Sequence, residues 1–244
     1  MVDRSLWIGW DPNPKEIAAF AVAKVSARRA LGPYIPIRGL MLGELKRLGL
    51  YTRQLEIRHT VDGPEMWDVI SQARQSTEHA NSRFLVPTIA ERGWALFSDA
   101  DVLFRRPLNT TFESLDRSKA VYCVKHDYRP KTTKKMEGAA QTQYFRKNWS
   151  SVCFYNCDHP SNRKLTVELF NKTPGRDLHR FCWLEDDEIG ELPPSFNFLV
   201  GHHSTKQVPD PHIVHFTEGT PNMAGYEDSP FAEEWWGELN RWAA

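Results

Sequence analysis

A short, wholly apolar segment followed within four residues by two aspartates is the feature that most constrains this fold. Residues 94–97 are Trp-Ala-Leu-Phe, and residues 98–104 continue as Ser-Asp-Ala-Asp-Val-Leu-Phe. An apolar run of this length, without polar alternation, is typical of a strand whose two faces are both covered by other elements. The sequence therefore predicts that residues 94–97 form a central, buried strand of a sheet.

Strand-like and helix-like segments alternate through the first half of the chain. Residues 5–10 predict a second buried strand, and Asn13 and Pro14 then supply the N-cap and first turn of a helix that ends at Gly32. This alternation is typical of an α/β sheet. The second half is irregular and contains no obvious linker, so we expect a single domain over residues 1–244.

The overall charge excludes some classes of protein. Lys plus Arg and Asp plus Glu both number 31, and a net charge of zero disfavours a generic binder of nucleic acid or membranes. Residues 125–147 are nevertheless rich in Lys and Arg, which predicts a specific anionic ligand. No apolar run is long enough to cross a membrane. No basic segment precedes an apolar stretch at the start, and the four cysteines are interpreted as buried free thiols, so the sequence predicts a cytoplasmic protein. They lack Cys-x-x-Cys spacing, which disfavours a zinc site.

Asp99 and Asp101 are the strongest candidates for metal ligands. They lie one residue apart on the turn that leaves the predicted central strand. Ligands of open α/β sheets collect beyond the carboxyl ends of the strands. Hard divalent cations prefer carboxylate oxygens, completed by phosphate and water. The alternative is an acidic turn in solvent, but the apolar segments on either side favour a metal site.

Residues 94–104 resemble the DxD segment of nucleotide-sugar-dependent glycosyltransferases of the GT-A fold, and are most similar to the retaining family 8 enzymes. Other segments resemble family motifs in the same order: residues 7–11, 82–87, 148–152, 186–189 and 214–219. The resemblance implies a GT-A-like, mostly parallel sheet with helices on both sides. It also implies a nucleotide-sugar-binding half, residues 1–105, and an acceptor and catalytic half, residues 106–244.

The resemblance assigns roles to individual residues. It implies that His215 is the third metal ligand beside Asp99 and Asp101, and this mixed donor set suits Mn²⁺ somewhat better than Mg²⁺. A metal held there neutralises the charge of the departing diphosphate. Arg83 corresponds to a basic residue that binds the donor, and Gly219 belongs to the C-terminal motif. Asp11, at the end of the first strand, is a candidate partner for the base or ribose.

Two departures from the family pattern change the expected site. Asp186 and Asp187 are the candidate catalytic carboxylates that would stabilise the oxocarbenium-like sugar, although the family usually has Gln at the position of Asp187. The alternative is an acidic helix end. The family's Lys after the C-terminal Gly is missing here. Another cation must therefore assist the diphosphate, and Lys131, Lys134 and Lys135 are the nearest candidates.

The sequence thus predicts a hexosyl- or pentosyltransferase that moves a sugar from a nucleotide diphosphate, expected to be a UDP-sugar, to a hydroxyl acceptor with retention. The acceptor is either a saccharide or a hydroxylated base in nucleic acid. A nucleotidyltransferase would normally carry a Gly-rich loop after the first strand, which residues 10–13 do not form. A non-catalytic protein that binds nucleotide sugars is the other alternative. The oligomeric state stays open.

Overall fold

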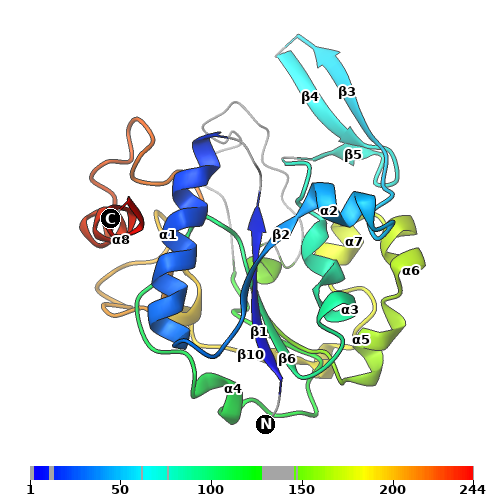
Figure 1. The fold of residues 1–244 in the computed structure, drawn as a ribbon. Helices are drawn as coiled ribbons and strands as arrows, with labels where there is room; N and C mark the ends of the chain where they lie inside the picture. Colours follow the sequence, from blue (N-terminus) through cyan, green and yellow to red (C-terminus); the bar gives the residue numbers. More distant parts are fainter. Residues whose placement is uncertain are drawn as a thin grey trace.

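All strands of the central sheet except β9 run in the same direction. The computed structural model describes residues 3–10, 14–61, 63–75, 77–127, 146 and 148–243. The six-stranded sheet has the order β10-β8-β9-β6-β1-β2 and lies at the centre of Figure 1. Its strands are β1 (Arg4–Trp10), β2 (Ile37–Met41), β6 (Trp94–Ser98), β8 (Val121–Cys123), β9 (Val152–Asn156) and β10 (Ile189–Glu191). This mostly parallel α/β sheet confirms the predicted fold class.

The central strand β6 is buried on both faces, as its apolar sequence predicts. Leu96 packs in one core cluster with Ala27 of α1, while its neighbour Phe97 packs in the other with Phe84. Successive strand residues point to opposite faces, so a strand covered on both sides must be apolar throughout. The helices are α1 (Pro14–Leu31), α2 (Leu42–Arg47), α3 (Val86–Ala90), α4 (Thr111–Ser114), α5 (Pro160–Lys164), α6 (Val167–Lys172), α7 (Gly175–His179) and α8 (Ala232–Ala243).

A small second sheet continues directly from the central strand. After Ser98 the chain turns through residues 99–101 and enters β7 (Val102–Phe104), which pairs antiparallel with β12 (Ile213–His215). The third strand, β11 (Phe198–Leu199), pairs with β12 on its other side. The register places His215 opposite Val102, so it brings the C-terminal region against the acidic turn.

A third sheet projects from the body of the molecule. It consists of β3 (Leu55–Thr60), β4 (Gly63–Asp68) and the short β5 (Ala73–Arg74), all antiparallel. Figure 1 shows the β3–β4 hairpin as an arm that extends away from the central sheet. The sequence analysis did not predict this hairpin.

Short 3₁₀ segments separate several elements: η1 (Ser82–Leu85), η2 (Trp149–Ser151), η3 (Asp186–Glu188) and η4 (Pro194–Phe196). The central sheet takes strands from both predicted halves of the chain, since β8, β9 and β10 lie beside β6, β1 and β2. The proposed division at residue 105 therefore stays a prediction about function. Within the part of the chain that the structure describes, no helix has the length and apolar character needed to cross a membrane.

Candidate metal and nucleotide-sugar site

The acidic turn after β6 is fixed at both ends by backbone hydrogen bonds. The amide of Asp99 donates to the carbonyl of Ser151 at 2.9 Å, and the carbonyl of Asp101 accepts from the amide of Phe216 at 2.9 Å. The turn is thus tied to the start of β9 on one side and to the end of β12 on the other. Because these contacts hold the backbone of the turn, they fix the points from which the two carboxylates project.

His215 completes the predicted cluster. Its Nε2 lies 3.2 Å from Oδ1 of Asp101 and 4.0 Å from Oδ2 of Asp99. One potential ligand atom from each of the three side chains lies within 4.8 Å of the others. The His215 side chain is 4% exposed, whereas those of Asp99 and Asp101 are 22% and 36% exposed. The cluster is therefore enclosed on the histidine side and open on the carboxylate side.

The donor set fits a divalent cation. Two carboxylates and one imidazole provide three protein ligands, which leaves coordination positions for phosphate oxygens and water. The cluster lies beyond the carboxyl end of β6, where parallel α/β sheets place their ligands. Asp99, Asp101 and His215 could therefore hold a metal ion, as the sequence analysis predicts.

A buried amide orients the histidine. Nδ1 of His215 lies 3.0 Å from Oδ1 of Asn197, which is fully buried. The Asn197 amide in turn donates to Oγ of Ser151 at 2.9 Å. A carboxamide oxygen can only accept, so Nδ1 carries a proton, and Nε2 is the nitrogen that faces the carboxylates and that a metal ion would use. Ser151 also accepts the amide of Asp99, and this buried network therefore joins two of the three candidate ligands.

Arg83 lies beside the cluster and contacts Asp99. Its Nη2 is 2.8 Å from Oδ1 of Asp99, and its Nη1 is 3.3 Å from Oδ2. The guanidinium also donates to the carbonyl of Ser150 and lies over the ring of Phe97. This two-point contact fixes the orientation of the Asp99 carboxylate. A contact between Arg83 and the donor stays a prediction.

The structure does not bring Asp186 and Asp187 together with the metal cluster. They lie at the amino end of β10, which runs in the same direction as β8 and β6. The metal cluster, by contrast, lies beyond the carboxyl end of β6. Asp186 forms an ion pair with Arg146, and its side chain is 88% exposed. The backbone carbonyl of Asp187 accepts from Lys119 at 2.7 Å. Their role in catalysis stays a prediction that these contacts do not support.

The remaining predicted residues divide into two groups. Gly219 follows β12, and a Cβ placed there would lie 2.8 Å from the ring of Tyr226, so this position has no room for a side chain. Asp11, Lys131, Lys134 and Lys135 lie outside the described residues, and their roles stay predictions.

The sequence analysis did not identify His126 as part of this region. It follows β8, whose carboxyl end lies at the same edge of the sheet as that of β6. Its ring lies 5.3 Å, between centroids, from that of His203. Neither ring nitrogen of His126 has a hydrogen-bond partner among the described residues. Burial lowers the pKa of His126 to about 3, so the ring is neutral. The sequence signal that could have identified His126 is its position shortly after a strand of the same sheet.

Comparison with curated proteins finds a plant relative. Protein CDI of Arabidopsis thaliana is 37% identical over 241 residues, which cover 97% of this chain and 86% of the relative. No family model matches the chain.

Several solved structures share the fold. The bifunctional glycosyltransferase WbbM superimposes with a TM-score of 0.63 at 12% identity, over 98% of this chain and 50% of WbbM. The glycosyltransferase GlyE of Streptococcus pneumoniae gives 0.58 at 15% identity, over 100% of this chain and 64% of GlyE. The galactosyltransferase LgtC, solved with donor and acceptor sugar analogues, gives 0.55 at 16% identity, over 97% and 95%. The chain thus spans only half of WbbM and less than two thirds of GlyE. At these identities the likeness establishes the GT-A glycosyltransferase fold.

Proposed function

This chain belongs to the family of the Arabidopsis thaliana protein CDI, and we propose that it is a metal-dependent glycosyltransferase that uses a nucleotide diphosphate sugar as donor. The observation that carries the proposal is the cluster of Asp99, Asp101 and His215. It lies at the carboxyl end of a central strand, in a fold shared with glycosyltransferases. Neither the fold nor the acidic turn would suffice alone.

The site residues have complementary tasks in this proposal. A bound divalent ion would neutralise the negative charge that develops on the diphosphate leaving group. Asp99 and Asp101 provide the two carboxylates on the open side, toward which the phosphates would approach. Arg83 keeps the Asp99 carboxylate in one orientation. Asn197 keeps the lone pair of His215 Nε2 directed at the same point. These contacts among the protein's own groups preorganise the site, which lowers the cost of ordering it.

Finer assignments follow from the resemblance to family 8 enzymes. We propose a UDP-sugar donor, Mn²⁺ as the preferred ion and transfer with retention. Asp186 and Asp187 stay candidates for stabilising the sugar, but the metal-site proposal does not depend on them. The acceptor is a saccharide or a hydroxylated base in nucleic acid. Salt separates these two, because binding to nucleic acid weakens steeply as the salt concentration rises.

The direct test is a screen of nucleotide sugars by thermal unfolding with Mn²⁺. A specific donor at about 100 times its Kd should stabilise the protein by about 2.7 kcal/mol, which corresponds to a rise in Tm of roughly 5–10 °C for a chain of this size. The stabilisation should require both the donor and the metal. Incubation of that donor with candidate acceptors, followed by mass analysis, then detects transfer.

Three outcomes of the screen are informative. Stabilisation with transfer of the sugar supports the proposal. Stabilisation by a donor without release of the free nucleotide diphosphate under any acceptor condition would favour a binding protein. Failure of all common nucleotide sugars to raise Tm in the presence of Mn²⁺ would contradict the proposal.

A further inference from the structure

The β3–β4 hairpin projects from the molecule (Figure 1). Some of its apolar side chains are exposed. Ile57 is 59% exposed, and Val61 in the turn is fully exposed. An isolated two-stranded hairpin is marginally stable in water, so the fold must hold this one in place by contacts at its base.

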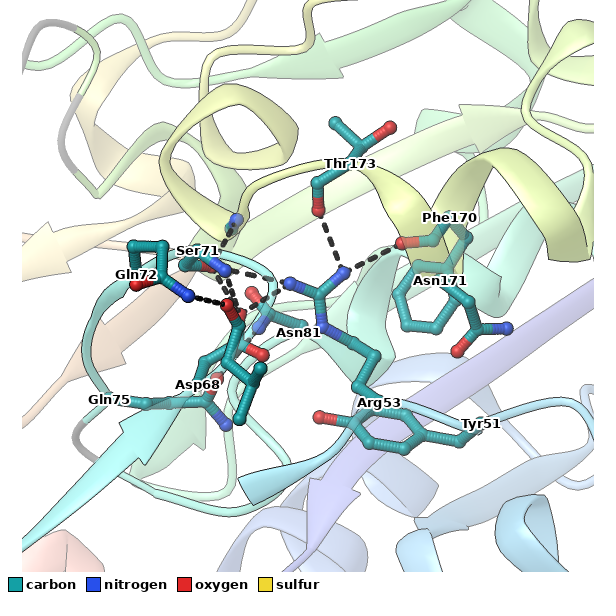
Figure 2. Close-up of polar contacts among 12 residues, drawn as sticks. Tyr51, Arg53, Asp68, Ser71, Gln72, Gln75, Asn81, Phe170, Asn171 and Thr173 are labelled. Carbon is teal, nitrogen blue, oxygen red and sulfur yellow. Dashed lines mark hydrogen bonds and ion pairs between the residues drawn. The ribbon is translucent and has the colours of Figure 1, made fainter. Parts of the chain in front are cut away.

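The base of the hairpin is fixed by a buried ion pair, shown in Figure 2. Arg53, just before β3, pairs with Asp68 at the end of β4, and both side chains are buried. Nη1 of Arg53 also donates to the carbonyls of Phe170 and Thr173, each at 2.7 Å. Asp68 also accepts from Ser71. The base of the hairpin is therefore attached to α6 by charge-assisted hydrogen bonds, which define how the arm leaves the body.

The outer edge of β3 has no strand beside it within the described part of the chain. Such an edge presents backbone N–H and C=O groups that can pair with another strand. Natural edges are often protected by proline or by charged side chains, above all lysine. The sequence of β3, Leu-Glu-Ile-Arg-His-Thr, contains neither proline nor lysine, and its two charged residues have opposite signs. The edge is thus open to pairing.

The side chains of the hairpin are divided between its two faces. Ile57 lies opposite Met66, which gives one apolar face. Glu56 and Arg58 point to the other face, where Arg58 lies 3.9 Å over the ring of Trp67. Glu56 and Arg58 therefore flank Ile57 with opposite charges, and within one chain they form an exposed ion pair of 3.2 Å.

We propose that β3 pairs antiparallel with β3 of a second copy of this chain, about a two-fold axis through Ile57. In this register Ile57 faces Ile57 of the second copy on the apolar face. On the other face, Glu56 lies opposite Arg58 of the second copy, and Arg58 lies opposite its Glu56. Directly opposite residues of an antiparallel pair point to the same face and interact. The strand is thus self-complementary in both shape and charge, as a two-fold interface requires.

The charge pattern favours a second copy over an unrelated strand. An unrelated partner would need an Arg or Lys opposite Glu56 and an Asp or Glu opposite Arg58. A second, antiparallel copy of β3 meets this need, because its Arg58 lies opposite Glu56 and its Glu56 lies opposite Arg58. The interface involves one strand on each side, so it is small, and we expect a reversible dimer in the micromolar range.

Sedimentation velocity over a wide range of protein concentration tests the proposal. The wild-type chain should pass from monomer to dimer as its concentration rises. Glu56→Arg places Arg opposite Arg58 of the second copy, and Arg58→Glu places Glu opposite its Glu56. Each single variant should weaken dimerisation by about tenfold or more, because like charges directly opposite each other repel. Glu44→Arg, on the exposed surface of α2, is the matched control and should dimerise as the wild type does.

Mixing the two single variants provides the decisive arm. A heterodimer of the Glu56→Arg and Arg58→Glu chains pairs opposite charges at both positions, so the mixture should dimerise again. The double variant with both substitutions should also dimerise on its own. A wild-type chain that stays monomeric at all concentrations would overturn the proposal. A dimer that the single variants do not weaken, or a mixture that does not dimerise, would also overturn it.

Discussion

Oδ1 of Asn197 lies 3.0 Å from Nδ1 of His215, and this contact decides which nitrogen of the imidazole faces the acidic turn. The two residues belong to neighbouring strands: Asn197 immediately precedes β11, and His215 is the last residue of β12. The parallel pairing of these strands, with Leu199 beside His215, brings the amide to the ring. A candidate metal ligand is therefore oriented by a residue 18 positions away in the sequence.

Asn197→Ala should weaken metal binding without removing a ligand. Loss of the amide frees the imidazole tautomer and leaves a cavity beside Ser151, and partners of this kind usually contribute about 10- to 100-fold to metal affinity. Titration with Mn²⁺, followed by calorimetry or by the Mn²⁺ electron paramagnetic resonance signal, measures the change. Asn240→Ala, at an exposed position on α8, serves as the control. Unchanged Mn²⁺ affinity in Asn197→Ala would mean that the contact is merely structural.

Asp99→Asn and Asp101→Asn should each abolish sugar transfer and Mn²⁺ binding while the fold stays intact. An amide keeps the shape of the carboxylate but loses the charge that a divalent cation requires. Asp228→Asn, which changes an exposed acid elsewhere, should behave as the wild type. Excess EDTA should abolish sugar transfer by the wild type, and added Mn²⁺ should restore it. Full transfer by either variant, or in EDTA, would refute the metal site.

Asp68→Ala should destabilise the protein strongly. The substitution leaves the buried guanidinium of Arg53 without its carboxylate, and removing one partner of a buried ion pair typically costs about 3–5 kcal/mol. Replacing both residues, as in Arg53→Met with Asp68→Leu, should cost less, because no uncompensated charge then remains. Urea unfolding measures both free energies. A single variant as stable as the double one would contradict this account of the network.

Stability should fall as the pH drops below about 6.5, in part because of His126. Burial lowers its pKa from 6.5 to about 3, so the unfolded chain binds a proton between these values and the folded chain does not. The contribution of His126 to the free energy of unfolding is fully present above pH 6.5. It is lost as the pH decreases from 6.5 toward 3, by up to about 1.4 kcal/mol per pH unit. Burial also lowers the pKa of His179, which adds to the same trend.

His126→Asn isolates this contribution. The variant should show a smaller decrease in unfolding free energy between pH 7 and pH 5 than the wild type, because one group that takes up a proton on unfolding is gone. His59→Asn, at an exposed position on β3, should leave the slope unchanged. Equal slopes in the His126 variant and the wild type would show that this ring does not govern the acid response.

Local sequence predicted the central strand because burial on both faces requires an apolar or small residue at every position of it. Residues 94–98 are buried on both faces, so each position must be apolar or small, and the pattern is visible without any neighbour. The hairpin escaped prediction for the opposite reason. Most of β3 is exposed, so no core selects an alternating pattern there.

By itself the sequence determined the buried strand, the α/β class and the acidic turn, because each depends on residues that are adjacent in the chain. It also indicated the third ligand through the order of its motifs. Only the tertiary structure decided that the β7–β12 register brings His215 to Asp101, that Asn197 orients the ring, and that Arg53 joins the hairpin to α6. It also placed Asp186 and Asp187 at the opposite edge of the sheet. The physical reason is that strand direction and register are set by packing between distant segments, which local patterns do not encode.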